Sequence, residues 1–293
     1  MDFSITHRPS PIRQVAPPEQ RRVDPWLGLV IGNTRLHWAL FQGDALQGVW
    51  HTRHVTPEQA HRLVQQQFTA PAWRSLSIAQ SIALELPKSL SRAMDAIASL
   101  SSPLPLYCAS VVPAQTALWH AYPGLQVVTL AAVPLADCYP SLGIDRALNL
   151  LGAGDRLGWP VIVVDAGTAL TFTAGVEGQF VGGAILPGLA TQFAALTTKT
   201  AALPQVEDDG QLPSRWASTT AAAIRSGVIY GTLATIQTFV ADWQRQHPNS
   251  KAVLTGGNGA QLYQWWRQVE GTAPAVVEPN LTFWGLRQLR RSH

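Results

Sequence analysis

Two aspartates stand where a carboxylate could do chemistry, and the first is Asp145. It lies in the segment YPSLGIDRALNLLGA, whose apolar spacing predicts a helix with Asp145 and Arg146 in its first turn. There Asp145 could serve as a general base, or it could only cap the helix and complement its dipole, and the spacing leaves both open. The later pair Asp155 and Arg156 falls near the expected helix end and is interpreted as surface structure.

The second aspartate, Asp165, closes the apolar run VIVVDAG just before a Gly-Thr turn. A carboxylate at the end of a buried strand is costly unless a cation or strong donors match it. We therefore favour a cation ligand over a residue that only stabilises the turn. Thr168 would then donate to a phosphate, and Gly256 and Gly257 of the sequence LTGG would let a nucleotide approach the backbone closely.

A strand followed by a glycine turn occurs twice, at Gly32-Asn33-Thr34 and at Gly167-Thr168. Each copy predicts a β-hairpin whose glycine lets the backbone approach an anion and whose threonine adds a donor. One copy alone would be typical of an ordinary turn. Because the two are about one domain length apart, they predict two lobes that grip one polyphosphate.

These turns require elements that hold them, and both halves of the chain show the same order. A three-stranded meander is followed by alternating helices and strands, which predicts two similar α/β lobes. After the first meander, from Trp26 to about Trp50, the segment 57–68 is expected to be a helix and 75–82 to include a strand. We divide the chain into three parts: a flexible leader at 1–25, an N-terminal lobe at 26–137 and a C-terminal lobe at 138–293.

Composition narrows the class of protein. With 293 residues, 46% hydrophobic and 13% charged, the chain can bury two cores, and no apolar run reaches the roughly 20 residues of a membrane helix. A net charge of +3, with basic residues spread along the chain, does not indicate nucleic-acid binding. Cys108 and Cys138 lack metal-site spacing, which favours buried thiols in a reducing compartment, the cytoplasm by default.

The ordered motifs GNT, SVVP, GIDR, DAGTALT, GGAILPG, RSGVIYG and LTGG resemble those of type III pantothenate kinases from about Trp26 to Leu289. The resemblance implies an actin-like fold, shared with acetate kinase, sugar kinases and Hsp70, of two ribonuclease H-like lobes. It also implies a homodimer that phosphorylates pantothenate with ATP, the first step towards coenzyme A.

The resemblance also implies a role for each matching residue. Asp145 would accept the proton of the pantothenate hydroxyl, Arg146 would suit the carboxylate, and Asp165 would bind potassium or ammonium. The substrate contacts would be Tyr139, Gly143, Ile144, Asp145, Arg146 and Thr220, with Thr220 reaching across the dimer interface. The ATP contacts would be Val30, Ile31, Gly32, Asn33, Thr34, Arg35, Leu36, His37 and Thr168.

One position departs from the family pattern. The first phosphate motif usually begins with an aspartate that helps to organise Mg²⁺, and this chain has Val30 there. Magnesium could still arrive bound to ATP and be held through water. Val30 also supports an alternative, a non-catalytic regulatory or scaffold relative, while a different small-molecule kinase is a third interpretation. The joint presence of Asp145, Arg146, Asp165 and Thr168 favours the enzyme.

Overall fold

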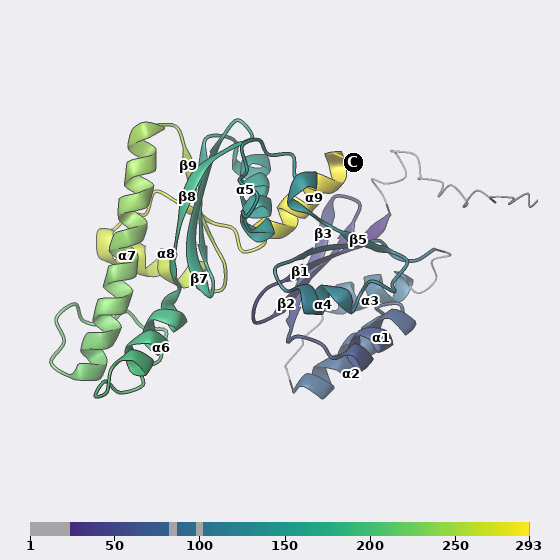
Figure 1. Ribbon diagram of the computed structural model, residues 1–293, viewed down its shortest axis with the longest axis horizontal. Coiled ribbons are helices and arrows are strands. Elements are labelled where there is room, and N and C mark those ends of the chain that lie inside the picture. The colour runs from purple at the N-terminus through teal and green to yellow at the C-terminus, as the bar shows by residue number, and fades with distance from the viewer. Residues whose placement is uncertain (1–23, 82–86, 98–101, 293) are drawn as a thin grey trace, which may run out of the picture.

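The computed structural model describes residues 24–81, 87–97 and 102–292. Nearly all of the leader expected at 1–25 lies outside these residues. Pro25 already begins the first strand. Within the described residues the chain forms two five-stranded sheets with helices packed against them, and Figure 1 shows them as two lobes side by side.

The first lobe is built on the strand order β3-β2-β1-β4-β5. The first three strands form an antiparallel meander, and β4 and β5 continue the sheet in parallel to β1. The strands are β1 (Pro25–Ile31), β2 (Leu36–Gln42), β3 (Ala45–Thr52), β4 (Leu106–Ser110) and β5 (Leu125–Val127). The helices are α1 (Pro57–Gln65), α2 (Ala70–Gln80), α3 (Lys88–Ile97) and α4 (Pro113–Ala117), followed by a 3₁₀ turn at Leu130–Ala132.

The second lobe repeats this plan with the order β10-β9-β6-β7-β8. Again three consecutive strands form the meander, and two later strands extend it in parallel. The strands are β6 (Val161–Ala166), β7 (Ala169–Val176), β8 (Gln179–Pro187), β9 (Lys251–Thr255) and β10 (Val276–Val277). The helices are α5 (Ile144–Leu157), α6 (Leu189–Lys199), α7 (Thr220–Gln246), α8 (Gly259–Glu270) and α9 (Leu281–Ser292). The duplicated topology is that of two ribonuclease H-like lobes, which confirms the actin-like α/β fold.

Helices α5 and α9 join the lobes and lie between the two sheets in Figure 1. Their apolar side chains form one cluster with first-lobe residues such as Trp26, Val30 and Phe41. The two helices approach closely at Gly152 and Gly285. A Cβ added to Gly152 would lie only 2.3 Å from the carbonyl oxygen of Leu281, and one added to Gly285 only 2.1 Å from that of Leu148. A larger side chain at either glycine would therefore separate the helices.

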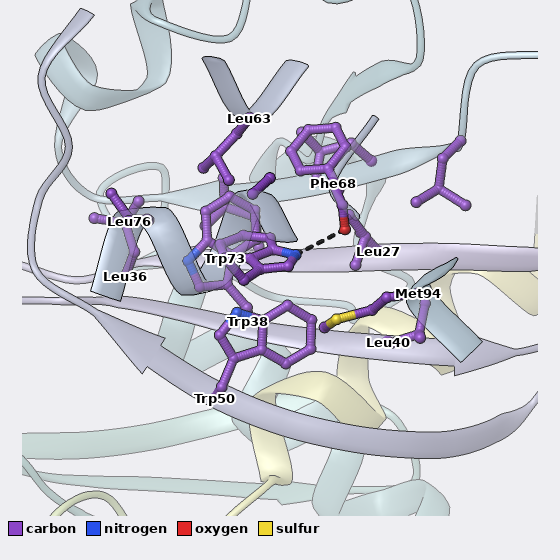
Figure 2. Close-up of a cluster of buried hydrophobic side chains, with 14 of the residues drawn as sticks. Leu27, Leu36, Trp38, Leu40, Trp50, Leu63, Phe68, Trp73, Leu76 and Met94 are labelled. Carbon is purple, nitrogen blue, oxygen red and sulfur yellow. Dashed lines mark hydrogen bonds between the residues drawn. The ribbon is translucent and has the colours of Figure 1, made fainter. Parts of the chain in front are cut away.

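The opposite face of the first sheet is covered by α1, α2 and α3 and carries an aromatic core. Trp38, Trp50 and Trp73 pack there with Phe68, and the Nε1 of Trp73 donates to the carbonyl oxygen of Phe68 over 2.8 Å (Figure 2). Because side chains alternate along a strand, the neighbours of Trp38 on β2 face the junction with the second lobe instead.

The strand expected within 75–82 is wrong, because residues 75–80 complete α2. The buried residues Trp73, Leu76 and Gln80 recur every three or four positions, which is helical periodicity, and the helix ends at Ser81 with a positive φ of 51°. Both cysteines are free: Cys108 is buried as expected, and Cys138 is only half-buried. Among the described residues, no helix combines the length and apolar character needed to cross a bilayer.

Candidate active site

Asp165 lies at the end of β6, where α5 passes over the sheet. Asn149 of α5 donates its Nδ2 hydrogen to Oδ2 of Asp165 over 2.8 Å, and Thr282 of α9 donates its hydroxyl to Oδ1 of Asn149 over 2.6 Å. This chain of hydrogen bonds fixes the amide so that its donor side faces the carboxylate. One oxygen of Asp165 is thereby held, and the other remains for a ligand.

Asp145 is on the first turn of the same helix, one turn before Asn149. Residues four apart lie on the same face of a helix, so Asp145 and Asn149 share the side that faces Asp165. Burial and the Asp145 carboxylate raise the pKa of Asp165 to about 6, while the Asn149 hydrogen bond acts in the opposite direction. Two acidic groups therefore lie near each other at the carboxyl end of β6, the middle strand of its sheet.

The helix N-terminus is capped at Gly143 without a side-chain hydrogen bond, which bears on whether Asp145 is only a cap. Asp145 does accept a hydrogen bond at Oδ1 from the backbone N–H of Arg146, over 2.8 Å. This contact satisfies one helix N–H and fixes the carboxylate in place. The carboxylate keeps further lone pairs, so capping and proton acceptance are compatible.

Gly256 brings the turn after β9 against Asp165. Its φ of +82° favours glycine, and an added Cβ would lie 2.4 Å from Oδ1 of Asp165 and 2.7 Å from the backbone carbon of Ala166. The neighbouring Gly257 has nothing within 4 Å of such a Cβ. Of the two glycines of LTGG, one is therefore required by packing, and the other borders open space.

The Gly167-Thr168 turn is held by Gly188, which follows β8, and by the first turn of α6. The backbone N–H of Gly188 and the hydroxyl of Thr191 both donate to the carbonyl oxygen of Thr168, over 3.0 and 2.8 Å. Thr168 itself is exposed. Backbone turns from three places in the sequence therefore converge on the end of β6.

Arg146 follows Asp145 but lies inside the protein, with only 6% of the residue exposed. Its Nε donates to the Thr173 hydroxyl over 3.0 Å, Nη1 to the Tyr139 hydroxyl over 2.8 Å, and Nη2 to the carbonyl oxygen of Phe172 over 3.0 Å. All three acceptors are neutral. Within the described residues this buried cation has no carboxylate within ion-pair distance, an arrangement that suits an anionic group from outside the chain.

The first phosphate turn joins β1 to β2 and is closed by a hydrogen bond of 3.0 Å from Gly32 N–H to the carbonyl oxygen of Arg35. The residues expected to contact ATP divide between strand and turn. Val30 and Ile31 end β1, Leu36 and His37 begin β2, and Asn33, Thr34 and Arg35 are exposed between them.

Thr220 is the first residue of α7, behind Thr219, which caps the helix by accepting from the N–H of Ala222. Helix α7 packs on one face of the second sheet with Ile162 and Val164. Leu150 of α5 packs on the other face with Val161 and Val163. Within one chain, Thr220 therefore starts a helix on the opposite face of the sheet from Asp145.

The family resemblance implies two cations, a monovalent one and magnesium, and the residues present do not suit both equally. Asp165 offers a half-buried carboxylate beside a second acid, without a cationic partner among the described residues, and this suits a monovalent cation. The first turn is not suited to hold magnesium directly, because the apolar side chain of Val30 supplies no ligand. Nowhere in the described part of the chain do three or more His, Cys, Asp or Glu side chains gather to hold a metal.

Sequence reasoning missed Asn149, Thr282 and Thr173, the residues that orient Asp165 and Arg146. Asn149 had a signal, since it follows Asp145 by four positions on an expected helix. Thr282 and Thr173 are distant in sequence from the groups they bind and had none. Asp155 and Arg156 do have structural roles: Asp155 pairs with Arg287, and Arg156 pairs with Glu278.

The sequence is similar over most of its length to known proteins of one family. The family model described as type III pantothenate kinase matches residues 26–242. A type III pantothenate kinase of Nostoc sp. is 43% identical over 269 residues, which cover 90% of this chain and 94% of that protein. One from Synechocystis sp. is 40% identical and covers 89% of both chains.

A solved structure also resembles the chain. The crystal structure of a conserved Baf family protein from Campylobacter jejuni has a TM-score of 0.56 and 17% sequence identity, and it covers 91% of this chain and 98% of its own. At 17% sequence identity, this similarity shows a shared fold alone.

Proposed function

The chain belongs to the type III pantothenate kinase family, so it phosphorylates pantothenate with ATP in coenzyme A biosynthesis, and we propose that Asp145 and Asp165 organise this reaction. The observation that carries the proposal lies at the carboxyl end of β6, where Asp165 is bound to the helix that carries Asp145 and three backbone turns converge. Phosphoryl transfer depends mainly on positioning and charge stabilisation, which such a site supplies.

In the proposed mechanism the phosphates of MgATP lie across the Gly32 and Gly167 turns, the latter with Thr168 as a hydroxyl donor. Asp145 accepts a hydrogen bond from the primary hydroxyl of pantothenate and aims its oxygen at the γ-phosphorus. As the P–O bond to that oxygen forms and the bond to ADP breaks, the hydroxyl proton passes to Asp145. The bound N–H of Arg146 keeps the carboxylate oriented for this step.

Magnesium enters as part of the MgATP substrate, and no residue of the chain is assigned to it. A potassium or ammonium ion bound to the free oxygen of Asp165 would place positive charge between the two acids and the phosphates. Asn149 supports this role because it holds the other oxygen of Asp165.

For pantothenate, we propose that the Arg146 and Tyr139 pair receives the carboxylate. Three of the five N–H groups of Arg146 are used by neutral acceptors, which leaves donors for an anion. Gly143 and Ile144 would border the same substrate at the start of α5. Thr220 fits the site only if a second copy of the chain supplies it, so we propose that the protein is a homodimer. We also propose that it works in the cytoplasm.

The test is a direct assay of the purified protein with MgATP, potassium and pantothenate, scored by mass for phosphorylated product. Parallel reactions with a panel of sugars and carboxylates test for a different small-molecule kinase. Binding of pantothenate without product would support the non-catalytic alternative. Light scattering of the same sample measures whether it is a dimer.

A further inference from the structure

Beside the first phosphate turn, two histidines face each other across neighbouring strands. His37 of β2 and His51 of β3 are register partners, and their Nδ1 atoms are 2.9 Å apart. The rings meet edge to face with centroids 4.7 Å apart. Two ring nitrogens at this distance share a single hydrogen, so one ring donates from Nδ1 and the other accepts there.

The other nitrogen of His37 is directed at the phosphate turn. Its Nε2 lies 3.9 Å from the position that a Cβ on Gly32 would occupy. The turn itself is held by His54, whose Nε2 lies 2.8 Å from the Gly32 carbonyl oxygen and must donate to it. His37 therefore extends from His51 at one nitrogen to the Gly32 backbone at the other.

The surroundings keep this pair uncharged. Burial, His51 and the Arg35 cation lower the pKa of His37 to about 4, and burial and Arg35 also lower the pKa of His51. Across the strand His37 is paired with Val30, which offers no carboxylate to favour an imidazolium. A neutral imidazole carries one hydrogen, and its position decides whether Nε2 donates or accepts.

We propose that His51 donates its Nδ1 hydrogen to His37 and thereby fixes His37 as the Nε2–H tautomer, which donates to a phosphate oxygen of the bound nucleotide. In the opposite tautomer, Nε2 of His37 would present a lone pair to the phosphate and repel it. His37 is thus a nucleotide-binding residue, and His51 is a positioning residue that acts through it. The inference rests on the proposed function only in placing ATP phosphates at the Gly32 turn.

Substitutions at His51 separate this role from simple packing. His51→Leu removes the donor, and the Kd of the ATP analogue AMP-PNP, measured by calorimetry, should rise roughly ten-fold. His51→Gln keeps an amide N–H and should restore affinity to within about three-fold of the wild type. The matched control is His61→Gln on α1, an exposed histidine outside the site, which should leave affinity unchanged. Equal defects in the Leu and Gln variants, or none in the Leu variant, would overturn the proposal.

Nitrogen NMR of histidine-labelled protein reports the tautomer directly. On addition of AMP-PNP, the His37 signals should show a protonated Nε2 and a bare Nδ1, and His51→Leu should abolish that preference. A bound state with hydrogen on Nδ1 of His37 would contradict the proposal. These readouts need no turnover, so a failure to phosphorylate pantothenate would refute the proposed function and leave the histidine inference to be judged by binding.

Discussion

Asn149 donates to Asp165 from the same helical face that carries Asp145, one turn earlier. One amide therefore links the proposed general base's helix to the proposed cation ligand. Because Asn149 is itself held by Thr282 of α9, the geometry of the site depends on the helix that joins the two lobes.

Asn149→Ala should weaken activation by potassium. Without the amide donor the charged form of Asp165 loses a hydrogen bond of the stronger, charge-assisted kind, so the carboxylate binds a cation less well. The potassium concentration for half-maximal activity should rise roughly ten-fold or more, measured by titrating KCl at constant ionic strength with choline chloride. Asp165→Asn should abolish the potassium response, and retention of a normal response there would remove Asp165 from the cation site.

Asp145→Asn should lower kcat by about 10²–10⁴-fold while the KM values change little. The amide preserves the shape of the side chain but cannot accept the proton of the hydroxyl nucleophile. Steady-state kinetics with saturating MgATP measure the effect, with circular dichroism as the folding control. A variant with normal turnover would show that another group, or none, acts as the base.

Arg146→Lys should raise the KM for pantothenate at least ten-fold and leave the KM for ATP nearly unchanged. Lysine keeps the charge but cannot reproduce the planar set of donors to Thr173, Tyr139 and Phe172. Tyr139→Phe removes a single acceptor and should have a smaller effect. If the KM for ATP rose instead, Arg146 would belong to the nucleotide site.

Gly256→Ala should reduce activity and lower the Tm, because its Cβ would overlap Asp165 and Ala166 at a positive φ. Gly257→Ala is the matched control, since its Cβ would meet nothing within 4 Å. Thermal unfolding of both variants checks the contrast, and turnover is measured for Gly256→Ala. Equal tolerance of the two substitutions would mean that the turn after β9 does not hold Asp165.

Asp44→Asn should lower stability at neutral pH by about 0.2–1 kcal/mol, the range for exposed ion pairs. The hydrogen bond from Arg291 lowers the pKa of Asp44 below its ordinary 3.8 in the folded state. The stabilisation is therefore present above pH 3.8 and is lost as the pH falls through the folded pKa. Urea unfolding should show a smaller difference between the two proteins at pH 2.5 than at pH 7.

The sequence was sufficient for the repeated meanders, because their strands alternate and their turns carry Gly, Asn and Thr. It also placed Asp145 on the first turn of a helix and Asp165 at a strand end. It failed at 75–82, where a short segment with several serines satisfied a strand pattern until Trp73, which shares a helical face with Leu76 and Gln80, was included. His51 and Thr282 could not be assigned, because only the fold brings them to His37 and Asn149.

The position of α9 bears on how the molecule is made. This helix ends the described chain, yet Phe283 and Leu286 pack against Gly28 in the first strand. The part of the first sheet that packs against α9 stays uncovered during synthesis until residues 281–292 have left the ribosome. The first lobe is therefore completed only after the second lobe has been synthesised, and a ribosome that stalls before Leu281 leaves a nascent protein without this apolar cover.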